Sequence, residues 1–253
     1  MKYTVLTLFP EITDAFFATS IMAKAIQRGI IEYRAINIRD FALDRHKTCD
    51  DAPYGGGPGM LMLPEPLGRA LEAAQNHPQS ASRPRTIYLS PSGRLFNQGI
   101  AQELAREQEL ILLCGRYEGI DQRVIDRYID DEISVGDYVL SSGEAAALAL
   151  IDATYRLVDR VITPESLEEE SFSNGLLEYP QYTRPEIYDT MKVPDVLLSG
   201  HHENIRRWRL EQRVEKTLQS RPDLIRRGKE LGLFNEEIIR LIGDREHERD
   251  KGN

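Results

Sequence analysis

The amino-acid sequence predicts an α/β fold built on a parallel sheet, followed by a small all-α domain. Up to residue 160, short apolar runs typical of strands alternate with segments whose apolar residues recur at helical spacing. This alternation is typical of βαβ units, in which right-handed crossovers connect parallel strands. From residue 185 onward the main patterns are helical. We therefore predict domains at 1–160 and 185–253, connected by a lid or interdomain linker at 161–184.

The expected elements follow from these patterns. Strands are expected at 2–9, 33–38, 86–90, 110–114 and 132–135. Helices are expected at 12–28, 60–74, 97–106, 143–158, 203–217, 224–231 and 236–242. The run at 110–114 is apolar throughout, which indicates a strand buried on both faces, with Cys114 as a core residue. It is expected to lie beside 86–90, which is followed by a glycine loop at Pro91-Ser92-Gly93.

The composition is that of an ordinary globular protein. Hydrophobic residues make up 41% of the chain and charged residues 29%, which argues against extensive disorder. No run approaches the ~18 apolar residues that a transmembrane helix needs. The first residues enter a strand pattern directly and the two cysteines fit a reducing compartment, so we expect no signal peptide and a cytoplasmic location.

The charge distribution leaves room for a nucleic-acid partner. The net charge of −9 alone argues against one. Residues 204–229, however, contain nine Lys or Arg against three Asp or Glu, a local charge of +6, whereas residues 1–203 contain 19 against 31. A basic helical segment can bind a polyanion locally, because phosphate attraction depends on the nearby field. A solvated helix face is the alternative.

Glycine-containing loops follow two of the expected strands and precede a long helix. Gly115 follows the strand at 110–114, Gly136 follows the strand at 132–135, and Ser141-Ser142-Gly143 precedes the helix at 143–158. Because glycine has no Cβ, backbone groups of such loops can approach a flat ring closely, and ligands of parallel sheets bind at the carboxyl ends of strands. The loops predict a cofactor pocket, with three ordinary turns as the alternative.

A further glycine-rich stretch, Tyr54-Gly55-Gly56-Gly57-Pro58-Gly59, matches no nucleotide-binding motif. It has no following Lys-Ser/Thr and does not complete G-x-G-x-x-G, so it is neither a P-loop nor a dinucleotide fingerprint. It is expected to be a loop that can approach another backbone closely, or a simple flexible turn.

The motifs GRYEGID (115–121) and SVGDYVLSSGE (134–144) closely resemble the cofactor loops of the bacterial tRNA (guanine-N1-)methyltransferase family, and the resemblance extends over almost the whole chain. It implies a SPOUT-class fold with a deep trefoil knot, a feature that the residue patterns alone do not indicate. It also implies that the loop at 54–59 lies near the active site and the bound RNA.

The resemblance implies S-adenosylmethionine as the cofactor. The positions that it assigns to cofactor binding are Tyr88, Leu89, Ser90, Gly115, Tyr117, Glu118, Gly119, Ser134, Val135, Gly136, Asp137, Tyr138, Val139, Leu140, Ser142 and Gly143. Ser142 stands where Gly is common, which should be tolerated if this position has φ below zero. Glu118 could instead be a helix-start carboxylate that the helix dipole stabilises.

Methylation of guanine N1 requires a positioned methyl donor, removal of the N1 proton and stabilisation of charge on O6. Orientation of the reactants lowers the activation barrier by ~7–11 kcal/mol in well-arranged systems, and a general base raises the rate by ~10²- to 10⁴-fold. The resemblance assigns Glu170 as the base and Arg156 as the group that stabilises O6. The family usually has aspartate at the position of Glu170, so Glu169 is a second candidate. By residue pattern alone, the acidic run at 168–170 and Arg156 could instead be solvated surface residues.

The remaining assignments concern the RNA. The residues expected to contact it are Arg116, Glu178, His201, His202, Arg206, Arg207 and Arg209. Trp208 is expected to pack rather than to stack on a base. No zinc pattern is present, and Mg²⁺ is possible in the family but cannot be inferred from these residues.

The expected function is methyl transfer from S-adenosylmethionine to N1 of the guanosine immediately 3′ of the anticodon, tRNA position 37. The resemblance further implies a homodimer with a shared active site. Two alternatives stay open: a SPOUT methyltransferase that acts on another RNA site, and a tRNA-binding protein without catalytic activity.

Overall fold

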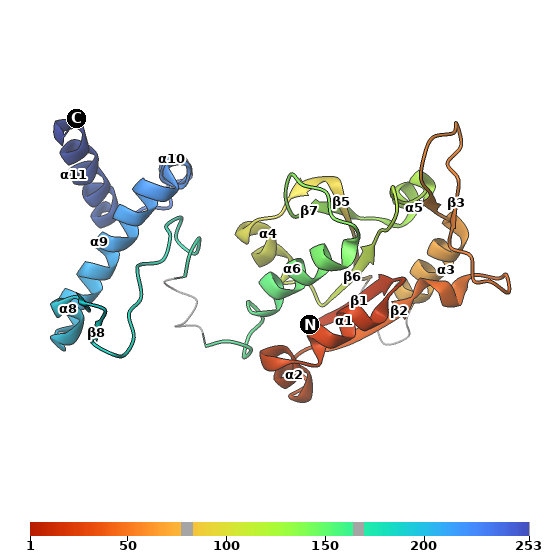
Figure 1. Cartoon of the computed structure of the whole chain (residues 1–253), viewed down its shortest axis with the longest axis horizontal. Coiled ribbons are helices and arrows are strands. Elements are labelled where there is room, and N and C mark those ends of the chain that lie inside the picture. The colour runs from red at the N-terminus through yellow and green to blue at the C-terminus, as the bar shows by residue number, and fades with distance from the viewer. Residues whose placement is uncertain (77–82, 164–169, 253) are drawn as a thin grey trace. The chain divides into compact units, whose positions relative to one another are not determined.

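A computed structural model describes residues 1–76, 83–163 and 170–252 (Figure 1). The chain divides into two compact units, Met1–Ile162 and Thr163–Asn253, which are called the N-terminal and C-terminal units below. Among the described residues, no helix is long and apolar enough to cross a membrane.

The N-terminal unit is built on a five-stranded sheet whose pairs are all parallel. The strands are β1 (Lys2–Thr7), β2 (Glu32–Asn37), β5 (Arg85–Leu95), β6 (Glu109–Cys114) and β7 (Asp131–Ser134). Their order is β2-β1-β6-β5-β7, and Leu89 of β5 pairs with Cys114 of β6. The predicted α/β class and the adjacency of β5 and β6 are therefore confirmed; the knot stays a prediction.

Helices cover both faces of this sheet (Figure 1). One face packs against α1 (Pro10–Phe17), α2 (Ser20–Gln27), α4 (Gln98–Leu104) and α6 (Gly143–Tyr155). The other packs against α3 (Pro64–Gln75) and α5 (Gln122–Tyr128). Each face of the sheet has its own hydrophobic core, because the side chains of β6 point alternately to the two faces. Leu112 and Cys114 belong to the first core and Leu113 to the second. Cys114 is thus a core residue, as predicted, and burial raises the pKa of its thiol.

The expected and observed elements of the N-terminal unit also differ in three other places. The helix expected at 12–28 is broken, because Thr19 is extended and Ser20 has a φ of +55°. The helix expected at 60–74 begins only at Pro64, since β4 (Leu61–Met62) pairs with β3 (Asp50–Asp51) instead. A 3₁₀ turn (η1, Ile38–Phe41) and α5 had no expected counterpart.

The predicted glycine loop at 91–93 is wrong, because β5 continues through it to Leu95. Leu89 and Arg94 both pair with Ile133 of β7, so the residues between them form a bulge. Arg94 supports the bulge by pairing with Asp131 at 2.5 Å and Glu103 at 3.1 Å. The arginines beside Glu103 lower the pKa of its carboxyl to about 2, so this network stays charged at neutral pH. After the bulge, the end of β5 pairs again with β7, Arg94 with Ile133 and Leu95 with Ser134.

The C-terminal unit is mainly helical. Its elements are β8 (Ile187–Tyr188), β9 (Met191–Lys192), α8 (Asp195–Leu198), α9 (His202–Ser220), α10 (Pro222–Glu230) and α11 (Glu236–Gly252). The short antiparallel pair of β8 and β9 is an addition to the predicted helices. The core contains residues from the three long helices and from the segments before α9 and α11: Leu176, Val214, Leu218, Ile225, Phe234, Ile238 and Ile242. Leu176 lies in the segment expected to be a linker, so part of that segment packs with the helices.

Candidate functional site

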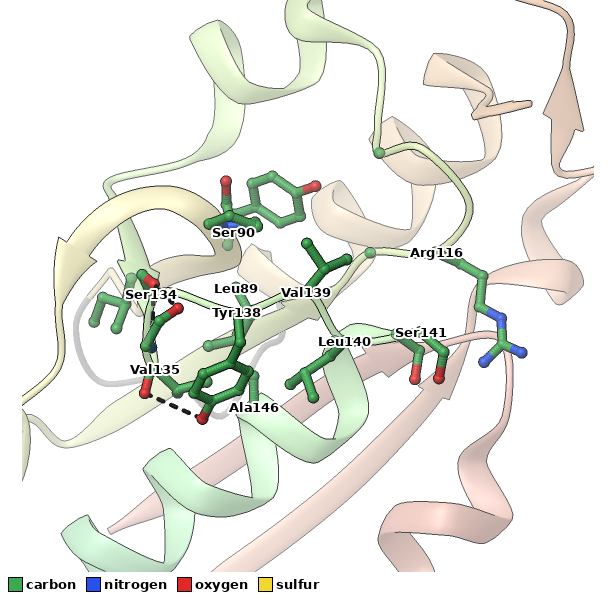
Figure 2. Close-up of a pocket in the computed structure, with 18 of the residues that line it drawn as sticks. Leu89, Ser90, Arg116, Ser134, Val135, Tyr138, Val139, Leu140, Ser141 and Ala146 are labelled. Atoms are coloured by element: carbon green, nitrogen blue, oxygen red, sulfur yellow. Dashed lines mark hydrogen bonds between the residues drawn. The ribbon is translucent and has the colours of Figure 1, made fainter. Parts of the chain in front are cut away.

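A pocket of about 380 Å³ lies at the carboxyl ends of β6 and β7, beside the bulge in the middle of β5 (Figure 2). Its lining residues are Tyr88, Leu89, Ser90, Pro91, Gly115, Arg116, Tyr117, Glu118, Gly119, Ile133, Ser134, Val135, Gly136, Tyr138, Val139, Leu140, Ser141, Ser142, Gly143 and Ala146. Every predicted cofactor residue except Asp137 is in this set. Asp137 is exposed in the loop between Gly136 and Tyr138.

The back of the pocket depends on two glycines that are far apart in sequence. The Gly143 N–H donates to the Gly115 carbonyl at 2.9 Å, and Arg116 bridges to Ser142. A Cβ on Gly143 would lie 2.8 Å from Cys114 Cα, so the start of α6 can approach the end of β6 only without a side chain. Ser142 has a φ of −167°, which any residue adopts, so serine is tolerated at this position as expected.

The loop after β7 presents apolar side chains beside the pocket. Ser134 Oγ accepts from the Gly136 N–H at 3.3 Å, which turns the chain, and the Tyr138 hydroxyl donates to the Val135 carbonyl at 3.3 Å (Figure 2). Val139 and Leu140, next in the loop, keep 89% and 40% of their surface exposed. Exposed apolar groups around a pocket are typical of a site that gains stability when a ligand covers them.

Glu118 connects the pocket to the glycine-rich loop at 54–59. Its carboxylate accepts the Met60 N–H at 2.7 Å, and its own N–H donates to the Met60 carbonyl at 3.2 Å. A Cβ on Gly59 would overlap this carboxylate. The helix-start interpretation of Glu118 is therefore wrong, because α5 begins at Gln122 and is capped by Asp121. At Gly59 the glycine-rich loop closely approaches a side chain, that of Glu118, and the backbone contact is made by the next residue, Met60.

Arg116, expected to contact RNA, also lines the pocket. Its side chain extends away from Leu89, Val135 and Tyr138 (Figure 2), and its guanidinium lies 4.7 Å from the ring centroid of Phe9. Four further residues line the pocket that were not expected from the sequence: Pro91, Ile133, Ser141 and Ala146. Ala146 could have been predicted, because it lies three residues after Gly143 and therefore on the same face of α6.

The two expected catalytic side chains belong to different units. Arg156 is half-buried at the C-terminal cap of α6 in the N-terminal unit. Glu170 is half-buried in the C-terminal unit, where its carbonyl accepts from Ser173 Oγ at 2.7 Å. The second base candidate, Glu169, lies outside the described residues.

Glu178 lies in the same unit as Glu170. Its N–H donates to Ser171 Oγ at 3.0 Å, and its carboxylate accepts from Gln181 Nε2. The segment therefore places both carboxylates, Glu170 and Glu178, on one short stretch of chain whose ends are hydrogen-bonded to each other.

The expected RNA-contacting residues at the start of α9 differ in how they are held. Arg206 pairs with Glu203 at 2.9 Å and with Glu237 at 3.4 Å, and these partners raise its pKa. Arg207 pairs with Glu211 at 3.0 Å, and the Arg209 guanidinium lies 4.8 Å from the Tyr179 ring centroid. His201 and His202 are exposed.

Trp208 is partly buried, and its ring centroid lies 6.4 Å from that of Tyr182, in agreement with the expected packing role. Within residues 1–76, 83–163 and 170–252, no group of three or more His, Cys, Asp or Glu side chains is arranged to hold a metal ion.

Known proteins match this chain over most of its length. The family model for tRNA (Guanine-1)-methyltransferase TrmD matches residues 1–227. The tRNA (guanine-N(1)-)-methyltransferase of Treponema denticola is 60% identical over 98% of this chain and 100% of that protein. Proteins of the same name from Treponema pallidum and Borreliella burgdorferi are 56% and 58% identical, over 98% and 88% of this chain and 97% and 92% of theirs. This chain belongs to the tRNA (guanine-N1-)methyltransferase family, as the motifs of its pocket loops predicted.

Proposed function

We propose that this protein transfers a methyl group from S-adenosylmethionine to N1 of the guanosine immediately 3′ of the anticodon, position 37 of tRNA. The observation that carries the proposal is the pocket at the ends of β6 and β7 and the bulge of β5, which is formed in large part by the loops whose motifs match the family. The names of the relatives support tRNA and guanine N1 as the substrate and target atom.

The pocket suits S-adenosylmethionine in size and chemistry. Its volume of about 380 Å³ is within the ~300–1,000 Å³ typical of ligand sites. Backbone groups at Gly115, Gly136 and Gly143 can meet the polar edge of an adenine ring, while Val139 and Leu140 can cover its face. Glu118, the acidic residue among the described lining residues, adds a negative charge that favours a sulfonium cation.

In the proposed reaction, the Glu170 carboxylate accepts the proton from guanine N1 while a new bond forms between N1 and the methyl carbon. S-adenosylmethionine supplies that methyl group, and its bond to sulfur breaks. The Arg156 guanidinium stabilises the negative charge that develops on O6, as a preorganised cation does without reorganisation. Glu178 helps to hold the guanine. The pocket fixes the orientation of the methyl donor, and orientation of this kind lowers the activation barrier by ~7–11 kcal/mol in well-arranged systems.

The tRNA is proposed to bind the C-terminal unit through Arg206, Arg207, Arg209 and the two histidines. The ion pairs of Arg206 and Arg207 are exposed, and such pairs contribute only ~0.2–1 kcal/mol each. Replacement of these carboxylate partners by phosphates therefore costs little free energy. Binding should weaken as the salt concentration rises, because phosphate contacts release counterions.

The same proposal includes a homodimer in which the pocket of one subunit works with Glu170 of the other. At subsaturating S-adenosylmethionine, we expect a mixture of Glu170→Gln and Gly143→Ala chains, unfolded and refolded together, to regain part of the wild-type turnover, because each mixed dimer then contains one intact pocket facing one intact base. Each variant alone is the control. No regained turnover in mixtures shown to contain mixed dimers would place the site within one chain.

The deciding test is methyl transfer from labelled S-adenosylmethionine to unmodified tRNA with guanosine after the anticodon. We expect transfer to this tRNA and none to the same tRNA with adenosine at that position. Label at another nucleotide would favour a methyltransferase of different site specificity. Binding of tRNA without any transfer would favour the non-catalytic alternative.

A further inference from the structure

Residues 170–178 form a closed turn rather than an extended connection. The Phe172 N–H donates to the Leu176 carbonyl at 2.9 Å, and the Glu178 N–H donates to Ser171 Oγ at 3.0 Å. The two carboxylate residues, Glu170 and Glu178, therefore stand at the two ends of one hydrogen-bonded loop. A displacement of the loop moves both of them.

Two side chains of helix α9 form hydrogen bonds to the backbone of one residue of this turn, Leu177. The Leu177 N–H donates to Thr217 Oγ1 at 2.9 Å, and the Leu177 carbonyl accepts from Arg213 Nε at 3.3 Å. Thr217 is fully buried and Arg213 is 4% exposed. Thr217 Oγ1 also donates to the Arg213 carbonyl at 2.6 Å, which fixes the direction of its remaining lone pairs. The backbone donor and the backbone acceptor of Leu177 are thus both bonded by buried side chains one turn apart on α9.

Apolar contacts fix the same turn against the helices. Leu176 is fully buried in the core that includes Val214 and Leu218 of α9. A Cβ on Gly175 would lie 3.2 Å from Leu233 and 3.3 Å from Phe234, so the turn passes close to the segment before α11. The turn is therefore part of the folded C-terminal unit.

Phe172 has a backbone conformation that bulky residues rarely adopt. Its φ is +75°, and its side chain keeps 44% of its surface exposed. Such a conformation persists only where surrounding contacts impose it, and it is commonly found near functional groups. The bonds from α9 to Leu177 are contacts of this kind; Leu177 is next to Glu178, and Phe172 lies two residues after Glu170.

We propose that Thr217 and Arg213 are positioning residues that set the location of Glu170 and Glu178 through the backbone of Leu177. The inference rests on the proposed function, because it gives these carboxylates their roles toward guanine. A buried hydroxyl and a buried guanidinium on a long helix hold this backbone more rigidly than a surface loop can, and proton transfer requires the base within hydrogen-bond reach.

The test compares Thr217→Val with Thr217→Ser in the full-length protein. Valine keeps the shape of threonine but removes the acceptor of the Leu177 N–H, whereas serine keeps the hydroxyl. We expect Thr217→Val to lower kcat by about 10-fold, within the ~10²-fold that a 1 Å misplacement can cost, with KM for S-adenosylmethionine unchanged. Thr217→Ser should restore most of kcat. Amide hydrogen exchange in 171–178 should accelerate in Thr217→Val and return toward wild type in Thr217→Ser.

Ile242→Ala is the matched control, because Ile242 is fully buried in the same core but makes none of these hydrogen bonds. It should lower the unfolding temperature of the C-terminal unit at least as much as Thr217→Val, with kcat retained at temperatures where the unit stays folded. A wild-type kcat in Thr217→Val, or an equal loss in Ile242→Ala, would overturn the positioning role. No transfer by wild-type protein would overturn the proposed function, and unchanged exchange in Thr217→Val would separately overturn the anchoring of the turn.

Discussion

Glu170→Gln is expected to lower methyl transfer by ~10²- to 10⁴-fold while S-adenosylmethionine binding stays at the wild-type level. Glutamine keeps the size and hydrogen-bonding ability of the side chain but cannot accept the N1 proton at neutral pH, and a general base contributes a factor of this size. Cofactor affinity should not change, because the pocket lies entirely in Met1–Ile162 whereas Glu170 belongs to Thr163–Asn253.

Single-turnover kinetics with saturating tRNA measure the rate of methyl transfer. Calorimetric titration measures the affinity of the pocket for S-adenosylmethionine. The matched control is Glu230→Gln, which removes the same charge from an exposed position on α10 and should retain wild-type turnover. Glu170→Asp should retain far more activity than Glu170→Gln, because it keeps a carboxylate and restores the usual family residue. Turnover by Glu170→Gln equal to wild type would assign the base elsewhere, with Glu169 the first position to replace.

The sheet could be predicted because its pattern is local and strong. The uninterrupted apolar run of β6 requires burial on both faces, and that requirement places a strand at the centre of a parallel sheet. The pocket followed from the same reasoning, since the parallel pairing of Leu89 with Cys114 brings the middle of β5 beside Gly115, which follows β6.

Other features depend on contacts between residues distant in sequence, which local patterns do not contain. The β5 bulge requires pairing with Ile133 and an ion network with Asp131, so Pro91-Ser92-Gly93 resembles an ordinary turn until β7 is in place. The short helix α5 depends on its Asp121 cap and on packing against α3, because seven residues are too few for strong periodicity.

The candidate catalytic segment illustrates the same limit. Its acidic and polar residues predict a solvated loop, and only the resemblance singles out Glu170. Burial of Leu176 and the bonds from α9 to Leu177 become visible only in the folded C-terminal unit. A polar segment can therefore be well ordered where one of its apolar residues is buried and the backbone of one residue is hydrogen-bonded by buried side chains of a helix.

Gly143→Ala is expected to weaken S-adenosylmethionine binding by ~100-fold, and methyl transfer at subsaturating cofactor should fall with it. The added methyl group would lie 2.8 Å from Cys114 Cα and 2.9 Å from Gly115 N, both of which are backbone atoms of the end of β6 and the loop that follows. Overpacking of this kind costs ~1–3 kcal/mol, and relief requires α6 to move away from β6. That movement would lengthen the hydrogen bond from Gly143 to Gly115, which holds the back of the pocket together.

The size of this effect can be judged against two other glycines. A methyl group on Gly115 would meet Tyr88 ring atoms at 2.9 Å, and a side chain can turn aside where backbone cannot, so Gly115→Ala should weaken binding less than Gly143→Ala. Gly243→Ala is the control, because a methyl group there meets open space within α11. Calorimetry gives the three affinities, and circular dichroism verifies that the sheet is retained. Wild-type affinity in Gly143→Ala would show that the pocket does not depend on the close contact between α6 and β6.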